Sequence, residues 1–299
     1  MEHKKEADSK GAQKRKEAME AVLGATHVLV GIGAGVSASG GHLYTNPALV
    51  DEWFPEYKKW GVQTLVDLQG LFWHLKDEES APLFWGYWAR HIQHCRYLAP
   101  LMPVYADIAR LLDSRPRDRW FVHSTNVDGQ LKIAGVDHAR VFAPQGEYAV
   151  FQCIKPCSDE VYDNRAMIDA MVAGMEDCYR VRKELVPHCP RCGDLLVPNL
   201  RSDDRFVEAP YMGTLPTYRE FLRSATAADT RLVLLELGVG FNSPGAIRFP
   251  FEEIVRENPA ARLVRVNLTE PQVSPDIAAR SFSIADDITH FMADLVKML

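Results

Sequence analysis

The sequence predicts an α/β protein in which helices flank a parallel sheet and a smaller metal-binding subdomain is inserted. Three observations carry this prediction: short apolar runs that end in glycine or polar residues, helical stretches between them, and two close cysteine pairs. Alternating strands and helices are typical of βαβ units, which build parallel sheets. A chain of 299 residues with 47% apolar content can bury a substantial core of this kind.

The first part of the chain begins with a helix and continues into a buried strand. Residues 1–25 are predicted to be the N-terminal helix, because Ala18, Ala21 and Val22 recur at helical spacing. The β-branched run at 26–32 ends in glycines, as a strand that feeds a phosphate-binding loop does. Dense aromatic residues at irregular helical spacing then indicate packed helices over 44–109.

Further strands are predicted on both sides of a segment that has a different composition. Strands are predicted over 120–125, 140–143, 231–238 and 261–268, with a helix over 251–257 between the last two. Residues 151–198 are rich instead in Cys, Pro and charge, with a helix predicted over 165–184. We therefore expect 151–198 to be an inserted subdomain and 26–150 with 199–299 to form the sheet domain.

Four of the six cysteines have the spacing of a metal site. Cys153 and Cys157 form one pair and Cys189 and Cys192 the other, and zinc prefers four tetrahedral sulfur or nitrogen ligands. The spacing predicts a structural Zn²⁺, with free thiols as the alternative. A set closed by four cysteines leaves no open position for catalysis. The two remaining cysteines, Cys95 and Cys178, are predicted to be small core residues.

Polar residues follow two of the predicted strands where a ligand would bind. Gly33, Ala34 and Gly35 come after the first strand, and glycines there allow a tight turn close to a pyrophosphate. Asn126 and Asp128 follow the second strand. A buried carboxylate two residues from an amide can hold a nicotinamide carboxamide so that its glycosidic bond lengthens, although such a pair can also simply form a turn.

In order and spacing, these segments resemble the sirtuins, NAD-consuming enzymes of the Rossmann type. The macrodomain-linked class is the most similar, and the resemblance covers about residues 20–295. It rests on Gly31-Ile32-Gly33-Ala34-Gly35-Val36-Ser37, Ser124-Thr125-Asn126-Val127-Asp128, Gln145-Gly146-Glu147-Tyr148, Tyr162-Asp163-Asn164, Pro198-Asn199-Leu200-Arg201 and the cysteine pairs. The segment Gly41-His42-Leu43-Tyr44-Thr45-Asn46 departs from the family's usual nicotinamide-facing sequence.

The resemblance implies a Rossmann NAD-binding domain with NAD as cosubstrate, and it implies which residues act. Asn126, Asp128 and Gln145 would be catalytic. The residues implied to bind NAD are Gly33, Ala34, Gly35, Ser37, Thr125, Asn126, Asp128, Gln145, Gly238, Gly240, Asn242, Asn267 and Asp287.

Gln145 decides which reaction the resemblance implies. Sirtuin deacylases have a histidine base at this position, and an amide cannot accept a proton at neutral pH. The expected activity is therefore protein mono-ADP-ribosyltransfer from NAD with release of nicotinamide. The macrodomain-linked class implies a lipoylated carrier protein as the acceptor and a macrodomain hydrolase as the reversing partner.

The sequence is also compatible with three other functions. The protein could be a deacylase that uses His123, His138 or His42 as its base, or a noncatalytic module that binds NAD or ADP-ribose. A glycohydrolase, with water as the acceptor, is the third.

Charge and hydropathy exclude other classes of function. The net charge of −6 lacks the basic footprint of a nucleic-acid protein. The sequence shows no secretory signal and no apolar stretch of about 20 residues, so we expect a cytoplasmic protein with no membrane partner.

Overall fold

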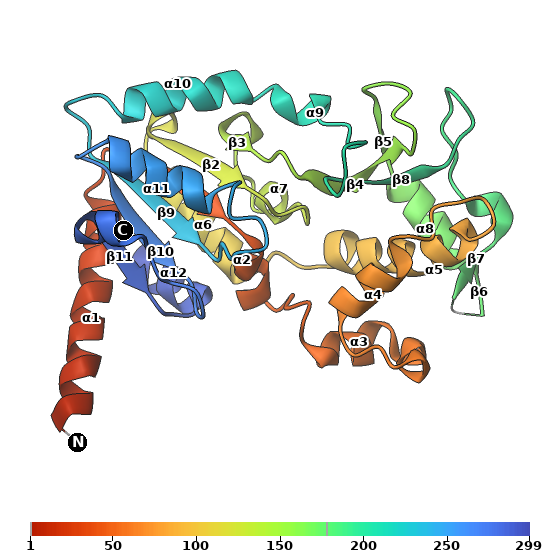
Figure 1. Cartoon of the computed structure of the whole chain (residues 1–299), viewed down its shortest axis with the longest axis horizontal. Coiled ribbons are helices and arrows are strands. Elements are labelled where there is room, and N and C mark those ends of the chain that lie inside the picture. The colour runs from red at the N-terminus through yellow and green to blue at the C-terminus, as the bar shows by residue number, and fades with distance from the viewer. Residues whose placement is uncertain (1, 178) are drawn as a thin grey trace.

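The computed structural model describes residues 2–177 and 179–299, which form two lobes (Figure 1). One lobe holds a parallel sheet between layers of helices, and the other holds a small antiparallel sheet with helices beside it. Cys95 is buried, as predicted, whereas Cys178 lies outside the described residues.

The large sheet has six parallel strands in the order β11-β10-β9-β1-β2-β3. From β1 the chain first extends the sheet through β2 and β3, and then returns to β1's other side to build β9, β10 and β11. The strand order therefore reverses between β1 and β9, which confirms the predicted α/β fold of Rossmann type. The strands are His27–Ile32 (β1), Trp120–Ser124 (β2), Val141–Phe142 (β3), Leu232–Leu237 (β9), Arg262–Val266 (β10) and Ser281–Ile284 (β11).

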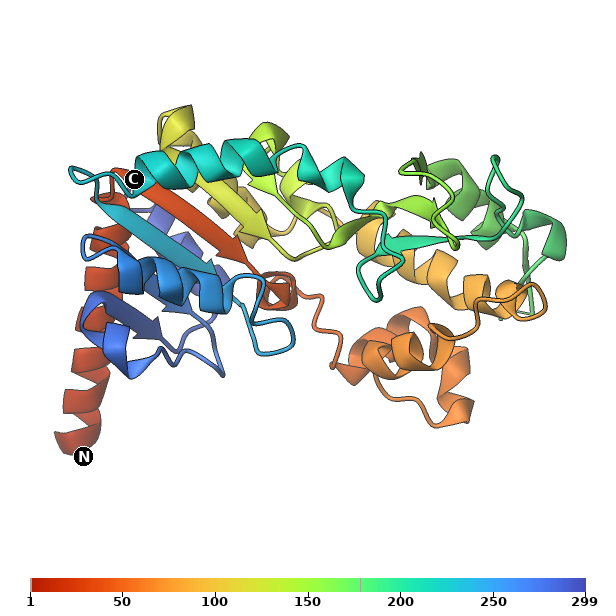
Figure 2. The ribbon, with the colours of Figure 1, turned by 45° about the horizontal axis from the view of Figure 1, so that its top comes forward.

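Helices cover both faces of this sheet because its strands are apolar on both sides. In β1, Val28, Val30 and Ile32 pack into one core and Leu29 into another. The first core is completed by α1 (Glu2–Leu23), α2 (Ala34–Ser39), α6 (Pro103–Asp113) and α12 (Ile288–Val296). The second is completed by α10 (Leu215–Ala225) and α11 (Arg248–Glu257), on the opposite face (Figure 2).

The small lobe is built around an antiparallel sheet in the order β5-β4-β8. Its strands are Gly146–Cys153 (β4), Val161–Asp163 (β5) and Leu196–Leu200 (β8). The predicted aromatic helices share its core: α3 (Pro47–Trp53), α4 (Leu65–Phe72) and α5 (Ala81–Ile92). The boundaries at residues 150 and 198 stay a prediction, and the strands β4 and β8 run past both of them.

One element of this lobe differs from the sequence prediction. The helix predicted over 165–184 ends early: α8 spans Arg165–Ala173, and a hairpin of β6 (Met175–Glu176) and β7 (Arg180–Val181) follows. Gly174 ends the helix, and Asp177 adopts a positive φ of 45° in the hairpin turn. A glycine and a left-handed residue together reverse the chain where helical periodicity alone predicted continuation.

Short helical elements complete the fold. They are η1 (Pro55–Trp60), η2 (Gln93–Tyr97), η3 (Arg117–Arg119), α7 (Gln130–Ile133), η4 (His138–Arg140), η5 (Lys183–Leu185), α9 (Ala209–Met212) and η6 (Pro275–Arg280). Among the helices in the described ranges, none combines the length and apolarity needed to cross a membrane.

Candidate functional site

Two glycine loops meet at the point where the strand order reverses. The Gly35 N–H donates to the Gly238 carbonyl at 3.0 Å, and the Gly33 N–H donates to the Leu237 carbonyl at 3.0 Å. A Cβ on Gly35 would lie 2.6 Å from the Gly238 Cα, which itself has a φ of 61°. Glycine is therefore required for the contact between the loops that follow β1 and β9. Open α/β sheets bind their ligands in this crevice.

Asn126 is held rigidly at the end of β2. Its Nδ2 donates to the Gly33 carbonyl at 3.0 Å, to the Ser37 hydroxyl at 3.1 Å and to the Tyr105 hydroxyl at 2.8 Å. Its backbone N–H also donates to the Ser124 hydroxyl. Because the amide nitrogen is fixed on the protein side, the Oδ1 atom is the end of the amide that can contact a ligand.

Asp128 is connected to the same network. The Ser37 hydroxyl donates to its Oδ2 at 2.5 Å, and the Gln130 N–H donates to its Oδ1 at 3.1 Å. The Tyr105 hydroxyl lies 2.8 Å from Ser37, so a single chain of hydrogen bonds runs from Asn126 through Tyr105 and Ser37 to Asp128. Burial raises the pKa of Asp128, and these two hydrogen bonds oppose that rise.

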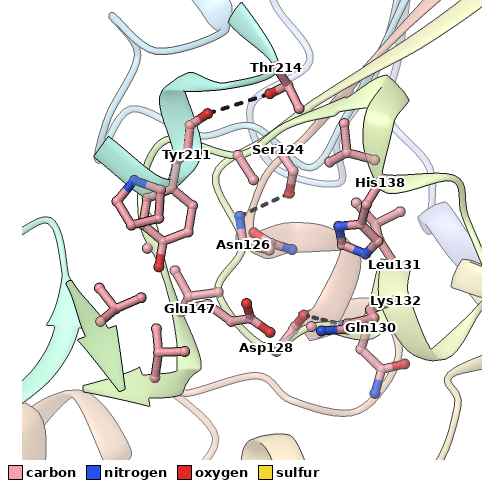
Figure 3. A pocket seen from close by; sticks show the side chains of 18 of the residues that line it. Ser124, Asn126, Asp128, Gln130, Leu131, Lys132, His138, Glu147, Tyr211 and Thr214 are labelled. Carbon is pink, nitrogen blue, oxygen red and sulfur yellow. Dashed lines mark hydrogen bonds between the residues drawn. The ribbon is translucent and has the colours of Figure 1, made fainter. Parts of the chain in front are cut away.

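Asn126 and Asp128 line a cavity of about 320 Å³ between the two lobes (Figure 3). Apolar side chains from β3, β4, β5 and α7 form much of its wall. Its other charged and polar residues are Tyr105, Ser124, Gln130, Lys132, His138, Glu147, Tyr211 and Thr214. Burial lowers the pKa of His138, partly offset by the charge of Glu147, so this imidazole is neutral at pH 7. The cavity thus combines apolar surface with a few fixed polar groups, as ligand sites do.

Gln145 lies in a different, shallower depression. Its neighbours there include His123, Arg201 and Ser243. In a regular strand, residues 145 and 147 would face the same side, but Gly146 between them has a φ of 97°. A Cβ on Gly146 would lie 2.0 Å from the Asn199 carbonyl oxygen, so only glycine permits this turn. Gln145 and Glu147 consequently line separate hollows.

His123 is unusual among the residues near Gln145. Both of its ring nitrogens are buried without a hydrogen-bond partner in the described structure. The rings of Phe142 and Tyr218 pack against it, and burial lowers its pKa to about 4.

The remaining predicted cofactor residues divide into loop positions and structural caps. Ala34 and Asn242 are exposed, and Thr125 donates twice to the Ile32 carbonyl. Asn267 Oδ1 accepts hydrogen bonds from the N–H groups of Thr269 and Glu270. Asp287 caps α12 by accepting from the His290 N–H, and Gly240 lies so close to Glu270 that a Cβ would contact its carboxylate at 2.9 Å.

The four paired cysteines come together as predicted. Their sulfur atoms all lie within 4.8 Å of one another. Cys153 and Cys192 are 3.5 Å apart, and Cys157 and Cys189 are 3.6 Å apart. Four zinc–sulfur bonds of about 2.3 Å in tetrahedral geometry would place the sulfurs about 3.8 Å apart. These residues therefore fit a zinc ion, which would bridge the β4 end and the loop before β8.

The sequence named His138 only as an alternative base, and it did not single out Tyr105, Glu147 or Tyr211 as members of the cavity or its network. Tyr105 lies inside α6, where an aromatic residue is usually part of the core. A signal was available only for Glu147, which follows Gln145 by two positions.

Fold and site together define an open α/β protein with a polar cavity at the carboxyl ends of its parallel strands. The chain is similar to a protein ADP-ribosyltransferase of Staphylococcus aureus (strain Mu50 / ATCC 700699). The two are 26% identical over 272 residues, which cover 90% of this chain and 83% of the relative.

A second relative is a probable bifunctional ADP-ribose hydrolase/ADP-ribosyltransferase of Fusarium oxysporum f. sp. cubense. It is 28% identical over 262 residues, which cover 86% of this chain and 43% of the relative. No protein-family model matches the chain.

Proposed function

We propose that this protein is a sirtuin-type, NAD-dependent protein mono-ADP-ribosyltransferase that releases nicotinamide. The observation that carries the proposal is the fixed Asn126 amide beside the buried Asp128 carboxylate, in a cavity next to the glycine loops. The names of the two relatives, one from a bacterium and one from a fungus, support ADP-ribosyl transfer.

The arrangement suits a dinucleotide that crosses the point where the strand order reverses. Its pyrophosphate would lie against the loops of Gly33 and Gly238, and Asn126 with Asp128 would hold the nicotinamide end. A fixed amide and carboxylate stabilise a strained, charge-separated geometry without having to reorganise. NAD would supply the reactive ribose carbon, and the protein's residues would orient it and exclude water.

The amide of Gln145 favours transfer over deacylation. An amide can hydrogen-bond a ribose hydroxyl or an acceptor but cannot accept a proton at neutral pH. Its depression also contains Arg201 and Ser243, which could bind a polar acceptor. We extend the proposal to a lipoylated carrier protein as acceptor, a macrodomain hydrolase as reversing partner, a structural zinc in the cysteine cluster and a cytoplasmic location.

A deacylase is the second candidate, and the observation that favours it is His138. This imidazole lines the cavity with Asn126. Its lowered pKa keeps the ring unprotonated at neutral pH, and only the unprotonated ring can accept a proton. Loss of lipoyl-lysine or acetyl-lysine hydrolysis in His138→Gln would support that reading. A protein that binds NAD but never releases nicotinamide would instead be the noncatalytic module.

The test uses purified protein, NAD labelled in its adenylate half, and either a lipoylated carrier protein or its unlipoylated form. Label that stays on the lipoylated carrier after denaturation supports the transferase. Nicotinamide release without labelled protein supports a deacylase or a glycohydrolase.

A further inference from the structure

Two carboxylates line the cavity, and the protein holds them differently. Asp128 accepts hydrogen bonds at both of its oxygens, from Ser37 and from the Gln130 N–H. The Oε1 atom of Glu147 is buried and has no hydrogen-bond partner in the described structure. A buried carboxylate oxygen without a donor is costly, so a donor on a bound molecule would relieve that cost.

The only cation paired with Glu147 among the described residues is Arg96, and the pair is loose. Arg96 Nη2 lies 3.6 Å from Glu147 Oε1, beyond hydrogen-bond distance, and Arg96 Nε is also buried without a hydrogen bond. The guanidinium keeps a negative charge acceptable at this position without occupying the carboxylate's lone pairs.

Glu147 also points into the cavity. Figure 3 shows its carboxylate between Tyr211 and Asp128, directed toward the hollow. The Tyr211 hydroxyl is already donated to Asn199 Oδ1, so Tyr211 is not available as a base. Of the two carboxylates on the cavity wall, Glu147 is the one with an oxygen that accepts no hydrogen bond within the described structure.

We propose that Glu147 is the base that takes the proton of the incoming acceptor, an inference that rests on the proposed function. The acceptor's lone pair forms a bond to the ribose C1′ of NAD. The C1′–nitrogen bond breaks, and its electron pair neutralises the positive charge of the departing nicotinamide. The acceptor's proton passes to the Glu147 carboxylate and then to solvent, which balances the reaction.

This role defines the chemical class of the acceptor. A base is useful only for a nucleophile that carries a proton, such as a hydroxyl, a thiol or an N–H group. A carboxylate acceptor has no proton to give, and both Asp128 and Glu147 would repel it. The site therefore selects proton-bearing nucleophiles.

The experiment compares two small probes as acceptors with Glu147→Gln. Methanol carries a proton on its nucleophilic oxygen, whereas azide is an anion that needs no base. The ratio of methyl ADP-ribose to ADP-ribosyl azide is measured, together with nicotinamide release. We expect this ratio to fall about 100-fold or more in Glu147→Gln, because general-base catalysis contributes roughly 10²–10⁴-fold.

Two further variants serve as a control and as a test of the competing base. Glu184→Gln is the matched control, since Glu184 also lies 3.6 Å from an arginine of the same lobe but outside the cavity. It should leave the ratio at the wild-type value. His138→Gln removes the imidazole of the cavity, which could also accept a proton.

The outcomes separate this inference from the proposed function. An unchanged ratio in Glu147→Gln, or a fall confined to His138→Gln, overturns the role of Glu147. If azidolysis is lost together with methanolysis while folding and NAD binding persist, Glu147 acts in nicotinamide departure and the inference is again wrong. If wild-type protein releases no nicotinamide with either probe or with lysate protein, the proposed function itself fails.

Discussion

The Ser37 hydroxyl donates a 2.5 Å hydrogen bond to the buried carboxylate of Asp128. Ser37 belongs to the helix that follows the first glycine loop, and Asp128 follows the neighbouring strand. This bond therefore couples the loop that would carry a pyrophosphate to the carboxylate that would hold nicotinamide.

Asp128→Asn should abolish transfer and yet make the stability of the fold less sensitive to a rise in pH above the ordinary carboxyl pKa. Burial raises the pKa of Asp128, so the folded state binds its proton more tightly than the unfolded chain does. The stability from this group is fully present below the ordinary carboxyl pKa and is lost as pH rises through the raised pKa. The asparagine variant lacks this loss.

Thermal unfolding of both proteins from about pH 4 to about pH 8 checks this prediction. The melting temperature of Asp128→Asn relative to wild type should increase with pH. A relative melting temperature that decreases over the same interval would contradict the effect of burial on this group.

Gly35→Ala should separate the two glycine loops. The added Cβ would meet the backbone of Gly238 at 2.6 Å, which no side-chain rotation can relieve. We expect a loss of about 1–3 kcal/mol in the free energy of unfolding and weaker NAD binding, measured by denaturant titration and calorimetry.

Gly70→Ala provides the matched control for this change. Gly70 lies in α4 with nothing within 4 Å of an added Cβ, so alanine should stabilise the helix by about 0.5–1 kcal/mol. Equal NAD affinity in the two variants would show that the loop contact does not shape the nucleotide site.

Cys189→Ser should release zinc and unfold the small lobe. Cys189 belongs to the four-sulfur cluster that ties the end of β4 to the loop before β8, so its loss removes a cross-link as well as a ligand. Zinc content by atomic spectroscopy and proteolysis of the small lobe check this. Cys95→Ser, in the same lobe but outside the cluster, should keep its zinc, and equal zinc content in both variants would exclude the cluster as the metal site.

Much of this architecture could be predicted from the sequence because local patterns determine it. The β-branched runs at β1 and β9 are buried on both faces and so read as continuous apolar stretches. The cysteine cluster could also be predicted from a local pattern, since zinc geometry restricts the spacing within each pair. The strand β11 was missed because Ser281–Ile284 alternates polar and apolar residues within only four positions.

The cavity itself could be predicted only in part. Asn126 and Asp128 follow a strand and were found, but their partner Tyr105 comes from a helix elsewhere in the chain. Gln145 and Glu147 face different hollows because Gly146 has a positive φ, and no periodicity reveals a single backbone angle. The predicted helix over 165–184 was wrong for a similar reason, since Gly174 ended it.

The role of Asn126 in ADP-ribosyl transfer is tested by comparing wild-type protein with Asn126→Ala in a single assay. Nicotinamide released from NAD and ADP-ribose bound to protein are quantified together by mass spectrometry. The proposed transferase mechanism predicts matching amounts of both products for wild type, and a loss of both in a folded Asn126→Ala variant. Protein-bound ADP-ribose that persists in Asn126→Ala at the wild-type rate would contradict it.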